Sequence, residues 1–140
     1  MSQQNVEIIS GMYEAFAQGD VPGVLGQLDA RVEWNEAENF IYADGSPYIG
    51  PEAVLAGIFV RLGAEWDAFT VTPASFHGAG ETVLVCGRFS GTYRATGKAV
   101  AAQFAHVWTL AEGKVVKFQE YTDTLQFAQV VGQAQNAATA

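Results

Sequence analysis

Two polar side chains in the last third of the chain stand among apolar residues and could carry acid–base chemistry. His106 alternates in phase with the bulky residues of the segment 103–110, and Glu120 does the same in the segment 115–123. Alternate residues of a strand face the same side, so both point inward if the bulky faces line a pocket. A carboxyl group beside an imidazole could remove a proton next to a carbonyl or deliver one to a leaving group. We predict Glu120 and His106 as a catalytic pair; the alternative is a buried structural pair.

The hairpin that joins these two segments decides whether the two side chains meet. A three-residue loop with a bulge pairs position 111 with 115, and hence His106 with Glu120. A two-residue turn pairs 111 with 114 and places Gln119 opposite His106. The longer loop also sets Trp108 beside Phe118 on one apolar face, so it is the register that we predict.

Other side chains could line the same pocket. Glu36 shares the parity of Trp34 and could be a second acid, or an exposed carboxylate at a strand end. Tyr42 and Tyr48 lie in an aromatic-rich loop and could offer a phenol to a ligand, or form a lid that only packs. The predicted pocket-lining residues are Trp34, Glu36, Tyr42, Tyr48, Phe59, Trp66, Phe104, Trp108 and Phe118.

The spacing of apolar residues predicts the elements that carry these side chains. Helical spacing predicts helices over about 6–16, 20–28 and 51–62, and Gly19 followed by Asp20 predicts a helix end and a new N-cap. Alternation and turn residues predict strands over about 31–36, 68–77, 81–94, 98–110 and 115–123, with a short helical turn over 125–131. The expected order is α-α-β-α-β-β-β-β.

This order predicts an α+β fold with N-terminal helices on one face of a mostly antiparallel sheet. The strand over 98–110 is long, so we expect the sheet to curve strongly around the helices and to enclose a concavity for a small molecule. We expect a single domain over residues 1–140, with its core over about 5–130 and a frayed tail over 132–140.

Composition argues against several classes of partner. The 140 residues include 15 acidic and 7 basic side chains, a net charge of −8, so we expect neither nucleic acid nor an anionic membrane as a partner. The chain has no apolar stretch of about 20 residues and begins without a signal-peptide pattern, which predicts a cytoplasmic protein. Cys86 is the only cysteine and there are two histidines, so we expect no metal site. No phosphate-binding or dinucleotide motif occurs, so we expect no cofactor.

Four segments in order resemble the superfamily of nuclear transport factor two, and more narrowly its SnoaL-like, ketosteroid-isomerase-related branch. They are Tyr13-Glu14-Ala15-Phe16-Ala17-Gln18-Gly19-Asp20, Val32-Glu33-Trp34, Gly50-Pro51-Glu52-Ala53-Val54, and the pair Glu112-Gly113-Lys114-Val115-Val116-Lys117-Phe118 with Tyr121-Thr122-Asp123-Thr124. The resemblance implies a cone-shaped half-barrel with a deep hydrophobic pocket for a small hydrophobic ligand, and a homodimer that forms through the sheet. It does not imply one reaction, because the same fold carries several chemistries.

The resemblance also bears on the mechanism. Ketosteroid isomerase uses a tyrosine, an aspartate base and a protonated aspartic acid. Aligned on the shared segments, these positions hold Met12, Trp34 and Ala105, so that mechanism is not expected here. Polyketide cyclases of the SnoaL kind use an acid on the last strand near a pocket histidine, which corresponds to Glu120 and His106. The predicted function is a cofactor-free isomerase or cyclase-like lyase acting on an apolar carbonyl compound. The alternatives are a non-catalytic binder of a small hydrophobic ligand and a dimeric structural module.

The outward face of the last strands is the expected dimer contact. On the long strand this face carries the small or semi-apolar side chains of Gln103, Ala105, Val107 and Thr109, and the next strand adds Gln119 and Tyr121. A flat face of that character suits an isologous contact between two copies.

Overall fold

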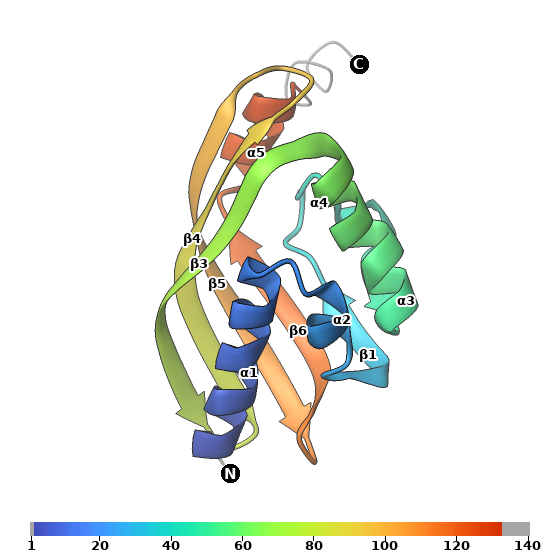
Figure 1. Ribbon diagram of the computed structural model, residues 1–140, viewed down its shortest axis with the longest axis vertical. Helices are drawn as coiled ribbons and strands as arrows, with labels where there is room; N and C mark the ends of the chain where they lie inside the picture. Colours follow the sequence, from blue (N-terminus) through green and yellow to red (C-terminus); the bar gives the residue numbers. More distant parts are fainter. Residues whose placement is uncertain (1, 133–140) are drawn as a thin grey trace.

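A strongly curved sheet of six strands wraps around the N-terminal helices in the computed structural model, which describes residues 2–132 (Figure 1). The strands are β1 (Leu28–Asn35), β2 (Tyr48–Ile49), β3 (Trp66–Ala79), β4 (Thr82–Tyr93), β5 (Ala99–Ala111) and β6 (Lys114–Thr122). Their order in the sheet is β2-β1-β6-β5-β4-β3. The pair β1–β6 is parallel and the other neighbouring pairs are antiparallel. The predicted α+β fold with a mostly antiparallel, strongly curved sheet is confirmed.

Helices cover one face of this sheet. They are α1 (Ser2–Ala17), α2 (Val21–Leu25), α3 (Pro51–Val54), α4 (Val60–Glu65) and α5 (Thr124–Val131). A π-helical turn over Leu55–Phe59 joins α3 to α4, and a 3-10 turn spans Ala43–Gly45. The sequence analysis predicted neither the π-helical turn nor the short strand β2. Apart from Gly132, the predicted frayed tail over 132–140 lies outside the described residues.

The break between α1 and α2 forms as the sequence predicts. Gly19 has a φ of +76°, a conformation that favours glycine, and it ends α1. The carboxylate of Asp20 then accepts a hydrogen bond from the backbone N–H of Gly23 at 3.0 Å and caps α2. The short step turns α2 away from the axis of α1 (Figure 1).

The β5–β6 hairpin has the predicted pairing but not the predicted loop. Ala111 pairs with Lys114 across a two-residue turn, whose residues Glu112 and Gly113 both have positive φ, as a type I′ turn requires. A bulge at Val116 then shifts the register by one residue. The three-residue loop is therefore wrong, yet His106 lies opposite Glu120 and Trp108 lies opposite Phe118, as predicted.

Between residues 2 and 132, no helix combines the length and the apolar character needed to cross a bilayer.

Candidate functional site

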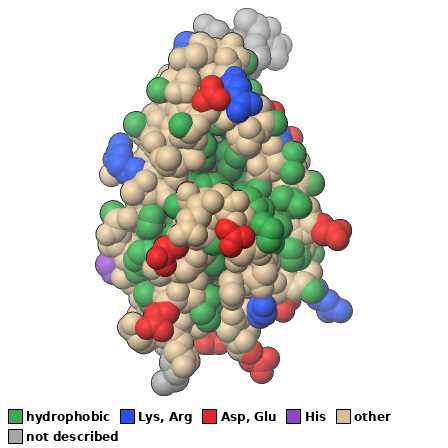
Figure 2. Space-filling view, in the orientation of Figure 1, with side chains coloured by type: hydrophobic (Ala, Val, Ile, Leu, Met, Phe, Trp, Pro, Cys, Tyr) green, Lys and Arg blue, Asp and Glu red, His purple; other side chains and the backbone are tan. Residues whose placement is uncertain are grey.

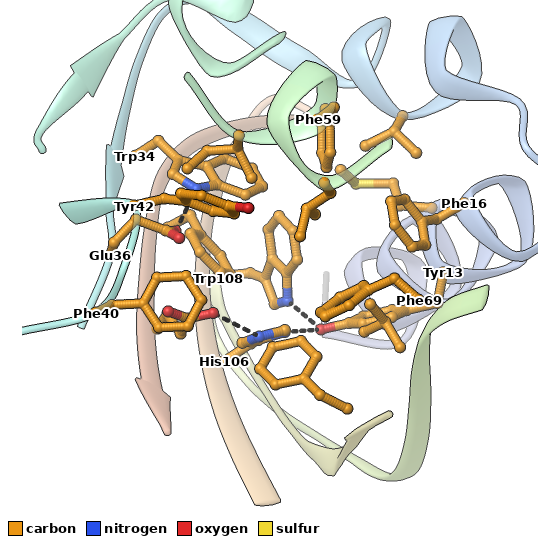
Figure 3. A pocket seen from close by; sticks show the side chains of 18 residues that line it. Tyr13, Phe16, Trp34, Glu36, Phe40, Tyr42, Phe59, Phe69, His106 and Trp108 are labelled. Atoms are coloured by element: carbon orange, nitrogen blue, oxygen red, sulfur yellow. Dashed lines mark hydrogen bonds and ion pairs between the residues drawn. The ribbon is translucent and has the colours of Figure 1, made fainter. Parts of the chain in front are cut away.

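A cavity of about 80 Å³ lies between the helices and the concave face of the sheet (Figure 3). Aromatic rings make up much of its wall. The indole of Trp34 lies edge-on to that of Trp108, with 5.6 Å between ring centroids, and Phe118 packs on both. Such a wall suits a flat apolar molecule. The volume of the cavity limits that molecule to a compact one.

The mouth of the cavity is apolar and faces solvent. Figure 2 shows hydrophobic side chains around a hollow between the α4–β3 segment and the C-terminal end of α1. The half-buried lining residues are Phe16 on α1, Phe59 in the π-helical turn, Leu62 on α4, and Phe69 and Val71 on β3. Phe59 ends the π-helical turn, and such turns are frequent at functional sites.

The floor of the cavity is polar, and His106 is one of the residues that form it. Nδ1 of His106 lies 2.6 Å from the hydroxyl oxygen of Tyr13, which also accepts a hydrogen bond from Nε1 of Trp108 at 3.0 Å (Figure 3). All three side chains are buried. Burial lowers the pKa of His106 to about 3 and raises that of Tyr13, so both are uncharged at neutral pH.

The other ring nitrogen of His106 has no hydrogen-bond partner. Nε2 lies 3.9 Å from Oε2 of Glu120, beyond hydrogen-bond distance. It is the one buried side-chain nitrogen or oxygen within residues 2–132 that lacks a partner. An unsatisfied buried polar atom is rare in a folded protein, and this one belongs to a residue that lines the cavity.

Two carboxyl groups line the same cavity as His106. Glu36 accepts a hydrogen bond from Nε1 of Trp34 at 2.8 Å, and Glu120 accepts one from the backbone N–H of Ala37 at 3.4 Å. Burial raises the pKa of Glu36 to about 8. Burial, and then the charge of Glu36, raise the pKa of Glu120 well above its usual range. The two groups therefore titrate as a pair that holds its protons to neutral pH or above.

Most of the predicted site residues surround this cavity. They are the candidate catalytic residues Glu120 and His106, together with Trp34, Glu36, Tyr42, Phe59, Trp108 and Phe118. Three predicted pocket-lining residues do not line it: Tyr48, Trp66 and Phe104.

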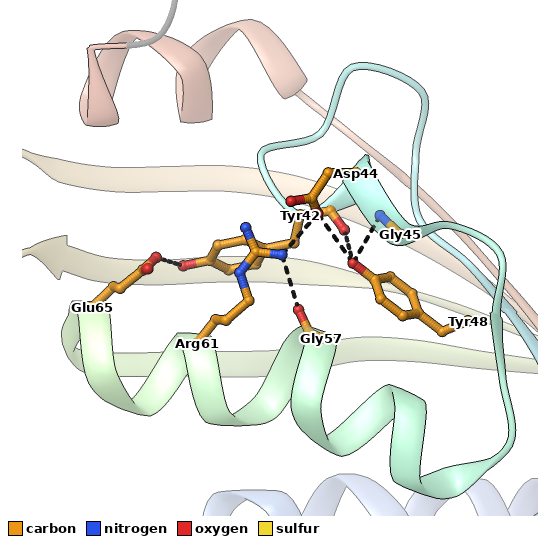
Figure 4. A network of polar contacts seen from close by, with 7 residues as sticks. All are labelled: Tyr42, Asp44, Gly45, Tyr48, Gly57, Arg61 and Glu65. Carbon is orange, nitrogen blue, oxygen red and sulfur yellow. Dashed lines mark hydrogen bonds and ion pairs between the residues drawn. The ribbon is translucent and has the colours of Figure 1, made fainter.

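The position of each of these three side chains has a packing reason. The ring of Tyr48 lies against Gly45 and Gly57, and its hydroxyl donates to the backbone oxygen of Tyr42 at 2.7 Å (Figure 4). Trp66 packs behind Tyr42 and donates its indole N–H to the Tyr42 hydroxyl at 3.0 Å. Phe104 stacks on His106 with 3.9 Å between ring centroids, so it supports that ring without reaching the cavity.

A polar network ties the loop that carries Tyr42 to helix α4 (Figure 4). The Tyr42 hydroxyl donates to Glu65, and the guanidinium of Arg61 lies 4.2 Å from the centre of the Tyr42 ring. Arg61 also pairs with Asp44 at 2.7 Å. The loop thereby holds one wall of the cavity in place.

The sequence analysis did not identify Tyr13 as a site residue. Helical spacing places Tyr13 on the apolar stripe of the first helix, and the structure buries it there. The available signal was chemical: a tyrosine on a buried helix face needs a partner for its hydroxyl. His106, which lies on β5 and 93 residues further along the chain, supplies that partner.

Within residues 2–132 no group of three or more His, Cys, Asp or Glu side chains is arranged to hold a metal ion.

Comparison with known proteins places the chain in a family. Residues 9–118 match the SnoaL-like domain. The chain belongs to the SnoaL-like family. An NTF2-like protein of Burkholderia thailandensis is 37% identical, with a TM-score of 0.87 over 91% of this chain and 96% of its own. The predicted superfamily and branch are thereby confirmed.

More distant structures share the fold. The protein TerC, co-crystallised with polyporic acid, is 24% identical, with a TM-score of 0.81 over 92% of this chain and 98% of its own. IdmH of Streptomyces antibioticus, provisionally described as a polyketide cyclase, is 20% identical, with a TM-score of 0.75 over 92% of this chain and 99% of its own. No curated protein matches the chain.

Proposed function

We propose that this SnoaL-like protein binds a small, apolar carbonyl compound in the cavity and moves a proton on it, as a cofactor-independent isomerase or cyclase-like lyase. The observation that carries the proposal is the unpartnered Nε2 of His106, which faces a carboxyl group across 3.9 Å at the floor of an apolar cavity. A carbonyl oxygen placed there would satisfy Nε2 and bring its neighbouring carbon close to Glu120.

The proton transfer follows from the charges of these groups. The pair of Glu36 and Glu120 loses its first proton near or above neutral pH, and the carboxylate so formed is a stronger base than an ordinary one. Glu120 acts as the base when the proton that the pair keeps lies on Glu36. It then takes a proton from the carbon next to the carbonyl, and the electron pair moves onto the carbonyl oxygen. Neutral His106 stabilises this oxygen as a hydrogen-bond donor. Where the substrate carries a carbon–carbon double bond conjugated with the enolate so formed, return of the proton to the far end of that double bond completes an isomerisation without loss or gain of atoms.

The relatives support a small organic ligand for this fold. TerC was crystallised with polyporic acid, and IdmH is provisionally described as a polyketide cyclase. Those descriptions concern those proteins; for this chain they favour a ligand with a carbon skeleton over a macromolecular partner.

A second candidate is a binder that does no chemistry. It is favoured by the anchoring of both carboxyl groups, because Trp34 and the backbone of Ala37 already donate hydrogen bonds to them. Under this alternative the ligand contacts the same floor and leaves unchanged.

Exchange of carbon-bound protons separates the two candidates without knowledge of the natural substrate. We expect the wild-type protein in D2O to accelerate deuterium uptake next to the carbonyl of phenylacetone, followed by NMR. Glu120→Gln keeps the shape but removes the base, and we expect the exchange rate to fall by about 10²- to 10⁴-fold.

Glu33→Gln is the matched control, since Glu33 lies on β1 but has a half-exposed side chain outside the cavity. We expect it to keep the wild-type exchange rate. Binding of the ketone without any exchange in the wild type would support the non-catalytic binder. Equal exchange in Glu120→Gln and the wild type would refute the assigned base.

A further inference from the structure

Two aromatic side chains determine which ring nitrogen of His106 carries the proton. Trp108 Nε1 lies 3.0 Å from the hydroxyl oxygen of Tyr13, and that oxygen lies 2.6 Å from Nδ1 of His106 (Figure 3). An indole N–H can only donate, so the tyrosine oxygen is the acceptor in the first bond. The single proton of the Tyr13 hydroxyl is then available for Nδ1, which accepts it through its lone pair.

The opposite arrangement would leave a buried proton unsatisfied. If Nδ1 carried the proton and donated it to Tyr13, the tyrosine O–H would need a further acceptor. Within residues 2–132 its hydrogen-bond partners are Trp108 and His106 alone. A buried hydroxyl without an acceptor loses its hydration without compensation. In that arrangement the Nε2 lone pair would lack a partner as well, so two buried groups would be unsatisfied, whereas a proton on Nε2 leaves only the Nε2–H without one. The neutral ring therefore carries its one proton on Nε2.

This proton has no acceptor in the protein. His106 is only 5% exposed, and its Nε2 lacks a hydrogen-bond partner. His106 and Glu120 both line the cavity, with 3.9 Å between Nε2 and Oε2. An N–H that is fixed in direction and lacks a partner requires an acceptor atom from whatever occupies the cavity.

We propose that Tyr13 and Trp108 are positioning residues that fix His106 in its Nε2–H form, and that the cavity thereby selects uncharged aromatic compounds whose carbonyl oxygen accepts from Nε2. The aromatic wall formed by Trp34, Trp108 and Phe118 receives the flat body of such a ligand. No Lys or Arg lines this cavity in the described part of the chain, so a ligand carboxylate would meet two carboxyl groups uncompensated. The carbonyl part of this inference rests on the proposed function, whereas the position of the proton rests on the hydrogen bonds alone.

Long-range ¹H–¹⁵N correlation NMR of the histidine rings tests the position of the proton directly. The chain has two histidines, and exposed His77 gives a reference signal in the same spectrum. We expect His106 at neutral pH to show a protonated Nε2 and an unprotonated Nδ1. A protonated Nδ1 in the wild type would overturn the inference whatever the variants do.

Two tyrosine variants test the positioning role. Tyr42 is a matched control, since it lines the same cavity and its hydroxyl also accepts from an indole, that of Trp66, but it does not contact His106. We expect Tyr13→Phe to shift part of the His106 population to the Nδ1–H form and Tyr42→Phe to leave it unchanged. Equal spectra for the two variants would refute the role of Tyr13, and the wild-type spectrum still decides if Tyr13→Phe fails to fold.

Three probe molecules of similar size test the selectivity. We expect acetophenone to shift the His106 Nε2–H resonance and to bind about two- to ten-fold more tightly than ethylbenzene, which lacks the acceptor. We expect benzoate to bind more weakly than acetophenone, and Tyr13→Phe to reduce the advantage of the ketone. Equal binding of acetophenone and ethylbenzene would overturn the selectivity. If acetophenone shows the expected contact while no ketone exchanges its protons, the proposed function fails and this inference stands.

Discussion

Glu36→Gln should make the protein more stable, and increasingly so as the pH rises. Glu36 is 6% exposed, and its carboxyl group accepts a hydrogen bond from the indole of Trp34. Glutamine can accept the same bond through its amide oxygen and never ionises. The substitution therefore removes the ionisation of a buried group while it keeps the shape and the contact.

The magnitude follows from the raised pKa. An ordinary glutamate has a pKa of 4.5, and burial raises that of Glu36 to about 8. Between these values the folded state holds a proton that the unfolded state has released, so the free energy of unfolding falls by about 1.4 kcal/mol per pH unit. This stability is fully present below pH 4.5 and is lost as the pH rises through about 8, a total of about 5 kcal/mol for Glu36.

His106 and Glu120 also titrate, and each affects how the free energy of unfolding depends on pH. Burial lowers the pKa of His106 to about 3, so this group makes stability rise with pH up to its ordinary pKa of 6.5. Because His106 is present in both proteins, its contribution cancels in the difference. The charge of Glu36 raises the pKa of Glu120, so Glu36→Gln also lowers the pKa of Glu120 towards its usual range. This further increases the stability of the variant over the wild type at high pH.

Urea denaturation of the wild type and Glu36→Gln between about pH 5 and pH 8 measures the effect. We expect the advantage of the variant to grow by about 4 kcal/mol over this range, and Glu33→Gln to run parallel to the wild type. Parallel curves for Glu36→Gln and the wild type would mean that Glu36 is already ionised in the folded protein. The reasoning on the carboxyl pair would then be refuted.

Three further substitutions test the packing and the assembly. A Cβ on Gly57 would lie 2.1 Å from a ring carbon of Tyr48, so Gly57→Ala should lower the free energy of unfolding by about 1–3 kcal/mol in urea denaturation. Asp20→Ala removes the cap of α2 and should cost about 1 kcal/mol in the same assay. Light scattering should give a homodimer of twice 15.0 kDa, which Tyr121→Glu weakens because Tyr121 is 57% exposed on the outer face of β6; a mass of 15.0 kDa at every concentration would contradict the dimer.

The fold was predictable because its signals are local and repeated. Alternating residues over β3 to β6 and the Gly19-Asp20 step each specify an element without reference to distant contacts. The π-helical turn over Leu55–Phe59 was not predictable in this way, since the apolar spacing of the segment fits an ordinary helix. Strand β2 has two residues and pairs only with β1, too short a run for an alternation pattern.

The site was predictable where the alternation of residues along a strand fixes the direction of a side chain. It was not predictable where that direction depends on the path of a loop or the tilt of a helix. Parity placed His106 and Glu120 on one face, and cross-strand pairing brought them together even though the turn differs from the expected one. The position of Tyr48 depends on the path of the preceding loop, which the sequence does not specify. Gly45 and Gly57 have no side chains and so leave room for the Tyr48 ring outside the cavity. Tyr13 required knowledge of which helix face meets β5, which only the packed structure supplies.

The polar floor of the cavity is unfavourable for folding, and this argues for a role in binding. A donor at His106 Nε2 without a partner costs about 1–3 kcal/mol. Burial keeps Glu36 and Glu120 protonated, and no Lys or Arg among the residues that line the cavity stabilises their charged forms. An apolar set of side chains at the same three positions would avoid these costs and would fill the space. Physical chemistry alone therefore favours a dry, closed core here, and the structure has an acidic, donor-bearing cavity with an apolar mouth instead. Costs of this kind, gathered at one concave place in an otherwise well-packed domain, are typical of a site whose missing partner is a ligand.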